Sequence, residues 1–172
     1  MRRRTLLALL VAAPLSSPAH ASAQPPDGAR ARFEDDLVSA LEGRWLLTRK
    51  IRGTEVKNNL TATWVLNHQF LQVHMVDVNQ PPAYEAIVLI GFIHVTKQYV
   101  AHWTDTFGGK FSAMGLGTRL GNSIEFRFQY PDGPFFNTFT FNPDAKQWVF
   151  RLESQQEDGS RRLFALDTLE RQ

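Results

Sequence analysis

Turn-forming residues divide most of this chain into short segments of similar length, and this spacing constrains its fold more than any other feature. After Gly43, pairs and runs of Gly, Pro, Asn and Asp recur roughly every 10 to 16 residues. The segments between them are rich in Val, Ile, Thr and aromatic residues, a composition typical of β-strands. We expect strands at about residues 44–52, 60–67, 69–78, 83–95, 98–106, 111–119, 122–130, 135–142, 146–156 and 160–170.

About ten strands with short links predict an all-β fold, namely a closed up-and-down antiparallel barrel. A β-sandwich is the alternative, but closure removes the edge strands that a sandwich must protect. Apolar and polar residues alternate clearly in some segments, such as 124–130 and 148–155. The alternation fails at residues 86–90, which are apolar on both faces. We therefore expect the outer face of this strand to be covered by the helix, by a long loop, or by a second subunit in a homodimer through residues 86–95.

One helix is expected before the first strand. Phe33, Leu37 and Leu41 recur at the helical spacing within residues 31–42, and three acidic residues at 34–36 suit the N-terminal end of the helix dipole. Gly43 is placed to end the helix. A short helix ahead of an all-β domain is expected to cover one end of the barrel.

The N-terminus has the pattern of a secretory signal peptide. Residues 1–4 contain three arginines, residues 5–15 are almost wholly apolar, and small residues follow up to Ala23. We place cleavage after Ala23, with Ala21 as the alternative, and expect a periplasmic or secreted protein. The apolar run is far shorter than the ~20 residues of a membrane span, so no integral membrane segment is expected after cleavage. Residues 24–30 then form a flexible lead-in, and residues 31–172 form a single barrel domain.

Charge and cysteine content narrow the classes of partner. The chain has 19 Lys and Arg against 17 Asp and Glu, and three of the arginines lie in residues 1–23, so the mature domain keeps 16 basic against 17 acidic residues. A nucleic-acid-binding surface needs clustered basic residues, and we expect none. The chain has no cysteine, which excludes disulfides and a lipid anchor on cysteine.

Five segments resemble one family, the small lipocalin-like (calycin) proteins catalogued as domain of unknown function 1579. They are Gly43-Arg44-Trp45, His68-Gln69-Phe70-Leu71, Gly91-Phe92-Ile93, Tyr99 to Asp105 and Leu169-Glu170-Arg171. The similarity spans about residues 41 to 171 and departs from the family pattern at His68, at Phe92-Ile93 and at Leu169. The resemblance implies a barrel whose first and last strands meet, with Gly43, Trp45 and Arg171 at the closure and the guanidinium over the indole. It implies no particular activity, because the family has no settled biochemical function.

Candidate ligand-binding residues are suggested by the two-residue period of a β-strand and by how much apolar surface each face of the strand would bury. Burying Tyr99 and Trp103 removes far more apolar surface from water than burying the opposite face of that strand, which carries His102. Asp105 must then follow Trp103 inward, with Arg49 or a turn amide near Gly108 as its donors. The full set predicted to bind a ligand is Arg49, Trp64, His74, Tyr99, Trp103 and Asp105. The alternatives are that Asp105 caps the following turn, that Arg49 extends outward, or that the face with His102 lines the cavity.

No catalytic or metal-binding pattern is present in the sequence. Its serines have no Gly-x-Ser-x-Gly context, and the histidines at 68, 74, 94 and 102 form no zinc-binding pair. A haem-ligating histidine late in the chain, as in the related nitrobindin barrels, is also missing, so we expect no cofactor and no metal. The Gly-x-Gly at residues 115–117 predicts close packing or a bulge, because no helix follows it.

The sequence therefore favours an exported barrel that binds a small apolar or amphipathic molecule. An enzyme of the isomerase or cyclase type is the first alternative, and it needs an inward carboxylate or histidine among Glu85, His74, His102 and Asp105. A non-catalytic envelope interaction module is the second, suggested by residues 86–95. No catalytic residue is assigned.

Overall fold

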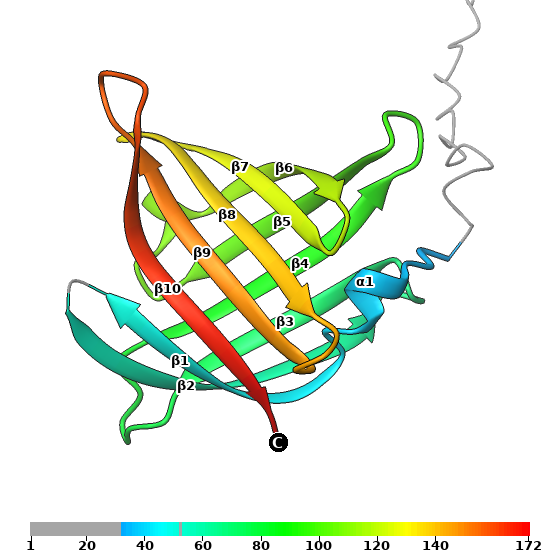
Figure 1. Cartoon of the computed structure of the whole chain (residues 1–172), viewed down its shortest axis with the longest axis horizontal. Helices are drawn as coiled ribbons and strands as arrows, with labels where there is room; N and C mark the ends of the chain where they lie inside the picture. Colours follow the sequence, from blue (N-terminus) through cyan, green and yellow to red (C-terminus); the bar gives the residue numbers. More distant parts are fainter. Residues whose placement is uncertain (1–31, 52) are drawn as a thin grey trace, which may run out of the picture.

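Ten antiparallel strands form a closed barrel in the computed structural model, which describes residues 32–51 and 53–172 (Figure 1). Each strand pairs with its neighbours in sequence, and β1 pairs with β10 to close the sheet. The predicted all-β, up-and-down barrel is therefore confirmed. In chain order the elements are α1 (Asp36–Ser39), β1 (Gly43–Ile51), β2 (Thr54–Val65), β3 (Phe70–Asp77), β4 (Glu85–Ile93), β5 (Gln98–Asp105), η2 (Gly109–Phe111), β6 (Ala113–Leu120), β7 (Ser123–Tyr130), β8 (Gly133–Asn142), β9 (Gln147–Gln155) and β10 (Arg161–Arg171). The predicted signal peptide at 1–23 and the lead-in at 24–30 lie outside the described residues.

The strand limits agree with the sequence prediction except at β2, which begins at Thr54 instead of near residue 60. The first four residues of β2 are all exposed, so no apolar alternation marks them. They form a strand because they pair with the end of β1, from Ile51 opposite Thr54 to Thr48 opposite Lys57. Backbone pairing with a neighbour thus decides the conformation where side-chain burial gives no signal.

Aromatic side chains fill the barrel interior between β5 and β9. Phe126, Phe128 and Phe150 are each at most 1% exposed. An added Cβ on Gly115 would lie 2.8 Å from the ring of Phe128, and one on Gly117 would lie 2.6 Å from the ring of Phe126. The register of β6 with both neighbours is unbroken, so these glycines serve close packing and not a bulge.

The strand that is apolar on both faces is β4. Its inward residues Ala86, Val88 and Ile90 are 1–2% exposed, whereas outward Ile87 is 39% exposed. The expected cover from the helix or a long loop is therefore wrong at Ile87. A second subunit in that place stays a prediction.

The helix before the barrel is shorter than predicted, because α1 holds only Asp36–Ser39. Asp35 is its N-cap and accepts a hydrogen bond from the Val38 amide, which fixes where the helix begins. The preceding Phe33 donates its backbone N–H to the His68 carbonyl at 3.0 Å and so lies along the barrel. The segment still covers one end, with Phe33, Leu37, Val38 and Leu41 only 1–3% exposed.

The closure between β1 and β10 has the predicted arrangement. Trp45 is opposite Arg171, and the guanidinium carbon lies 5.1 Å from the centre of the indole ring. Arg171 also donates to the Glu42 carbonyl at 3.2 Å, and the Trp45 ring nitrogen donates to the Leu41 carbonyl at 2.8 Å. Gly43 has φ of +127°, and a Cβ there would lie 2.9 Å from Arg171 Nη2, so only glycine fits without strain.

Within residues 32–51 and 53–172, no helix has the length and apolar character needed to cross a membrane.

Candidate ligand-binding cavity

A cavity of about 640 Å³ opens at the end of the barrel opposite α1. Its lining includes Ile51, Ala83, Phe107, Asp132 and Arg162, which lie at or next to the β1–β2, β3–β4, β5–β6, β7–β8 and β9–β10 connections. These five connections share one end of an antiparallel barrel, and the chain enters β1 from α1 at the other. A smaller hollow of about 340 Å³, lined by residues 154 and 162–164, adjoins the cavity and shares three of its lining residues.

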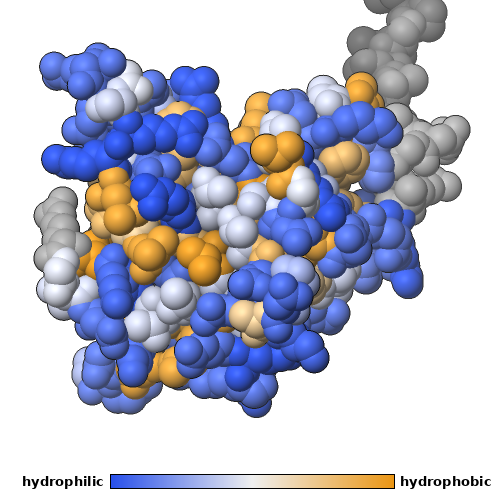
Figure 2. All heavy atoms as spheres, in the orientation of Figure 1, coloured by the Kyte–Doolittle hydropathy of each residue, from blue (hydrophilic) through white to orange (hydrophobic). Residues whose placement is uncertain are grey.

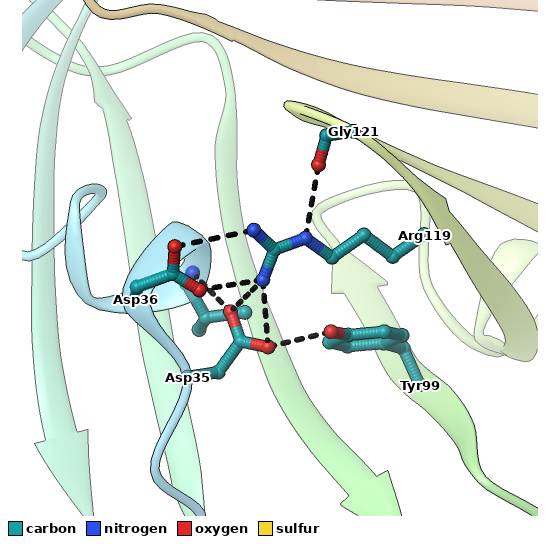
Figure 3. A network of polar contacts seen from close by, with 6 residues as sticks. Asp35, Asp36, Tyr99, Arg119 and Gly121 are labelled. Carbon is teal, nitrogen blue, oxygen red and sulfur yellow. Dashed lines mark hydrogen bonds and ion pairs between the residues drawn. The ribbon is translucent and has the colours of Figure 1, made fainter.

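The other end is closed by a polar network over α1 (Figure 3). Tyr99 donates to Asp35 at 2.5 Å, and Arg119 contacts Asp35 at 3.3 Å and Asp36 at 2.6 Å. Arg119 also donates to the Gly121 carbonyl at 2.9 Å. Burial, and then the bond to Asp35, raises the pKa of Tyr99 to about 12. Because this network and α1 close one end of the barrel, the mouth of the cavity lies at the opposite end.

Apolar side chains gather at this mouth. Figure 2 shows a hydrophobic patch between the tips of the β1–β2 and β9–β10 hairpins, on the side away from α1. Val56, Phe107 and Leu163 at this end are 38%, 70% and 45% exposed. Exposed apolar groups around a cavity are typical of a binding mouth.

Seven aromatic residues line the cavity: Tyr84, Trp103, Phe107, Phe111, Tyr130, Phe135 and Phe164. Six of these rings, all but that of Trp103, form a continuous series from Tyr84 to Phe164, with neighbouring centroids 5.5–6.4 Å apart. Burial raises the pKa of Tyr84 to about 12, although nearby Arg49 opposes the shift. The cavity wall is therefore mainly aromatic, with the phenols in their neutral form.

Trp103 faces inward as the parity argument predicts. It is 5% exposed and lines the cavity, whereas His102 on the other face of β5 is exposed. The alternative in which His102 lines the cavity is excluded by this geometry.

Asp105 follows Trp103 into the wall, and one of its two expected donors, a turn amide near Gly108, is confirmed. Its Oδ2 accepts from the Trp103 ring nitrogen at 3.2 Å and from the Tyr84 hydroxyl at 3.3 Å. Its Oδ1 accepts from the Phe107 amide at 3.0 Å, so Asp105 also caps the turn after β5. The predicted bond from Arg49 is wrong, because Arg49 is engaged elsewhere.

Arg49 points inward and pairs with Asp167, a residue that was not among the candidates. Nε and Nη2 donate to the two carboxylate oxygens at 2.8 and 2.7 Å, and the side chains are 9% and 0% exposed. Burial alone would lower the pKa of Arg49, but the Asp167 carboxylate outweighs it and the pKa rises. The guanidinium carbon also lies 5.7 Å from the centre of the Tyr84 ring. The guanidinium of Arg49 therefore keeps its positive charge, and the carboxylate of Asp167 already balances that charge.

Three more buried polar residues line the cavity, namely Asn58, Asp77 and Asn137, at 3%, 8% and 2% exposed. Asn58 and Asp77 are opposite each other on β2 and β3. Asp77 accepts from the amide and side chain of Asn79 at 2.9 and 2.8 Å. Among the described residues Asn58 makes no side-chain hydrogen bond, and Oδ1 of Asn137 has no partner.

Three predicted ligand residues lie elsewhere. Tyr99 is buried in the network over α1, and Trp64 stacks on His68 at 3.9 Å and packs edge-on to Phe33, both at the closed end. His74 lies on the outer face of β3, where Nε2 bonds Glu85 at 2.6 Å. Parity placed Tyr99 on the inward face, but parity does not say at which end of the barrel a residue lies.

The acid–base candidates separate in the same way. His74, Glu85 and His102 are on the outside of the barrel, and Asp105 alone of the four lines the cavity. Any acid–base role in the cavity would therefore fall to Asp105 within the predicted set.

Known protein structures resemble this protein in fold. The crystal structure of Rv2717c from M. tuberculosis is similar at a TM-score of 0.55 with 14% identity, over 78% of this chain and 94% of that one. A redesigned β-barrel matches over 79% of this chain and 95% of its own at 14% identity, with a TM-score of only 0.35. No protein-family model matches the sequence, and no curated protein matches it.

Proposed function

We propose that this protein binds a small, largely apolar or amphipathic molecule in the cavity at the open end of the barrel. The observation that carries the proposal is the cavity of about 640 Å³ with its aromatic wall. Small-molecule sites occupy about 300–1,000 Å³ and combine apolar walls with a few placed polar groups. The cavity has both, since polar groups such as those of Arg49, Asp105 and Asn58 interrupt a lining rich in aromatic residues.

The ligand enters through the mouth between the strand connections. Its apolar body packs against Trp103, Tyr130 and Phe164, and its polar group reaches Asp105 or Asn58. Burial of that body supplies most of the affinity, at roughly 25 cal/mol for each Å² removed from water. The polar groups fix its orientation.

We further propose that the protein is exported and is a divergent lipocalin-like (calycin) barrel. The basic and apolar N-terminus supports export, and the five family-like segments with the Trp45–Arg171 closure support the affiliation. Detection of the processed chain in the periplasm or medium, with its new N-terminus at Gln24 or Ser22, tests the export.

Binding is tested by tryptophan fluorescence with a panel of fatty acids, isoprenoid alcohols and aromatic probes. Trp103 lies in the cavity wall, so an occupant changes its emission. Ala83→Phe adds bulk to an exposed residue of the cavity lining and should weaken binding. Ala145→Phe, at an exposed residue of the β8–β9 turn, is the matched control and should not. Indifference to the whole panel contradicts the proposal.

An isomerase-type enzyme is the second candidate function, favoured by the position of Asp105 in the cavity wall. It requires turnover of a bound ligand, detected as product by mass spectrometry, that Asp105→Asn abolishes without loss of binding. Bound ligand recovered unchanged by the native protein contradicts it.

A further inference from the structure

The charges inside the cavity are not balanced; Asp132 and Arg162 also line it, but both are exposed at its mouth. Arg49 is neutralised by Asp167 through two hydrogen bonds. Asp77 and Asp105 also line the cavity, and within the described part of the chain no basic nitrogen lies within 4.0 Å of either carboxylate. Buried charges in proteins are generally paired, so the charge that the interior of this cavity lacks is positive.

Aromatic rings surround one of the two carboxylates. Trp103 and Tyr84 donate to Asp105 through their ring-edge polar groups, at 3.2 and 3.3 Å. Phe107, whose amide donates to Asp105, packs 5.8 Å from Tyr84. Ring faces attract cations, and a set of aromatic rings with a carboxylate is the usual environment of an ammonium group.

The second carboxylate has an unpaired polar neighbour. Asn58 is opposite Asp77 and lines the same cavity at 3% exposure, and its side chain makes no hydrogen bond to another described residue. A buried amide without a partner is costly unless a ligand or water satisfies it. Its carbonyl oxygen can accept from a ligand N–H beside Asp77.

We infer that the ligand carries a positively charged nitrogen, as a protonated amine or a quaternary ammonium, on an apolar body. This inference rests on the proposed function, since it names the class of molecule that the same cavity takes. The ammonium lies among the aromatic rings near Asp105 and Asp77, and the apolar body lies along the wall toward Phe135 and Phe164. A free carboxylate is disfavoured inside the cavity, because two unpaired carboxylates repel it and Arg49 is already paired. The other arginine of the lining, Arg162, is exposed at the mouth.

Three probes that share the same decyl chain length and differ in head-group charge test which charge the cavity prefers. They are decyltrimethylammonium, decanol and decanoate, each titrated into the purified protein by calorimetry. Decyltrimethylammonium should bind at least about tenfold more tightly than decanoate. Asp105→Asn should weaken the ammonium by about tenfold and leave decanol unchanged, and Asp77→Asn should act in the same direction. The control Asp144→Asn, at an exposed turn residue outside the cavity, should change neither.

The outcomes separate this inference from the proposed function. If decanoate binds most tightly, or if both cavity variants leave the ammonium unaffected, the inference is overturned while the cavity keeps its binding role. If Asp105→Asn weakens decanol as much as the ammonium, the carboxylate shapes the cavity instead of recognising charge, which also overturns it. If none of the three probes binds, the proposed function fails together with the inference.

Discussion

Arg49 and Asp167 are opposite each other on β1 and β10 and are joined by two hydrogen bonds inside the barrel, at 2.8 and 2.7 Å. Removing one partner leaves a buried charge without compensation. Arg49→Met or Asp167→Asn should each lower the free energy of unfolding by about 3–5 kcal/mol in urea titrations. The double variant Arg49→Met/Asp167→Leu should cost clearly less than the sum of the two. Additive costs would show that the two residues act independently.

Disrupting the closure between the first and last strands should lower the free energy of unfolding by a smaller amount. Arg171→Ala removes the guanidinium over Trp45 and the bond to the Glu42 carbonyl, and should cost about 0.5–2 kcal/mol of unfolding free energy. Arg44→Ala, an exposed arginine on the same strand as Trp45, is the matched control. Equal effects of the two substitutions would contradict a sealing role.

Close packing under β6 is tested with two glycines. Gly117→Ala places a methyl group 2.6 Å from the Phe126 ring and should cost about 1–3 kcal/mol. Gly109→Ala has open space around the new Cβ and should change stability little. Thermal or denaturant unfolding of both variants measures the contrast. Tolerance of Ala at 117 would mean that the rings move aside freely.

All three tyrosines should ionise late. Burial raises the pKa of Tyr84 and Tyr99 to about 12 and that of Tyr130 upward as well. Absorbance at alkaline pH should therefore show little tyrosinate near pH 10, where tyrosines of an unfolded chain are half ionised. A folded pKa above the unfolded value means that stability holds below about pH 10 and falls as pH rises from there through about 12. A tyrosine that titrates normally in the folded protein would contradict this burial.

Strand parity predicted much of the fold and part of the cavity. The alternation that put Trp103 inside and His102 outside is local, and the structure agrees. The same rule argues against His74, because Leu71, Val73 and Met75 on the other face of its strand are buried. That signal was present in the sequence and was overlooked.

Depth along the barrel and pairs across strands could not be predicted in this way. Tyr99 and Trp103 share a face, yet one lies at the closed end and the other in the cavity. That difference depends on the register of several strands. Apolar residues lie on both faces of β10 around Asp167, with Ala165 and Leu169 on its own face and Leu166 on the other. The sequence around Asp167 therefore does not show that it faces Arg49.

Occupation of the cavity is the central claim, and amide chemical-shift mapping by NMR tests it most directly. Saturation with decanol should shift resonances around the cavity, such as those of Ile51, Leu152 and Phe164, and leave those of Leu41 and Phe141 at the closed end unchanged. Shifts confined to the outer face of β4, or no shifts at saturating decanol, would contradict a ligand-binding cavity at the open end of this barrel.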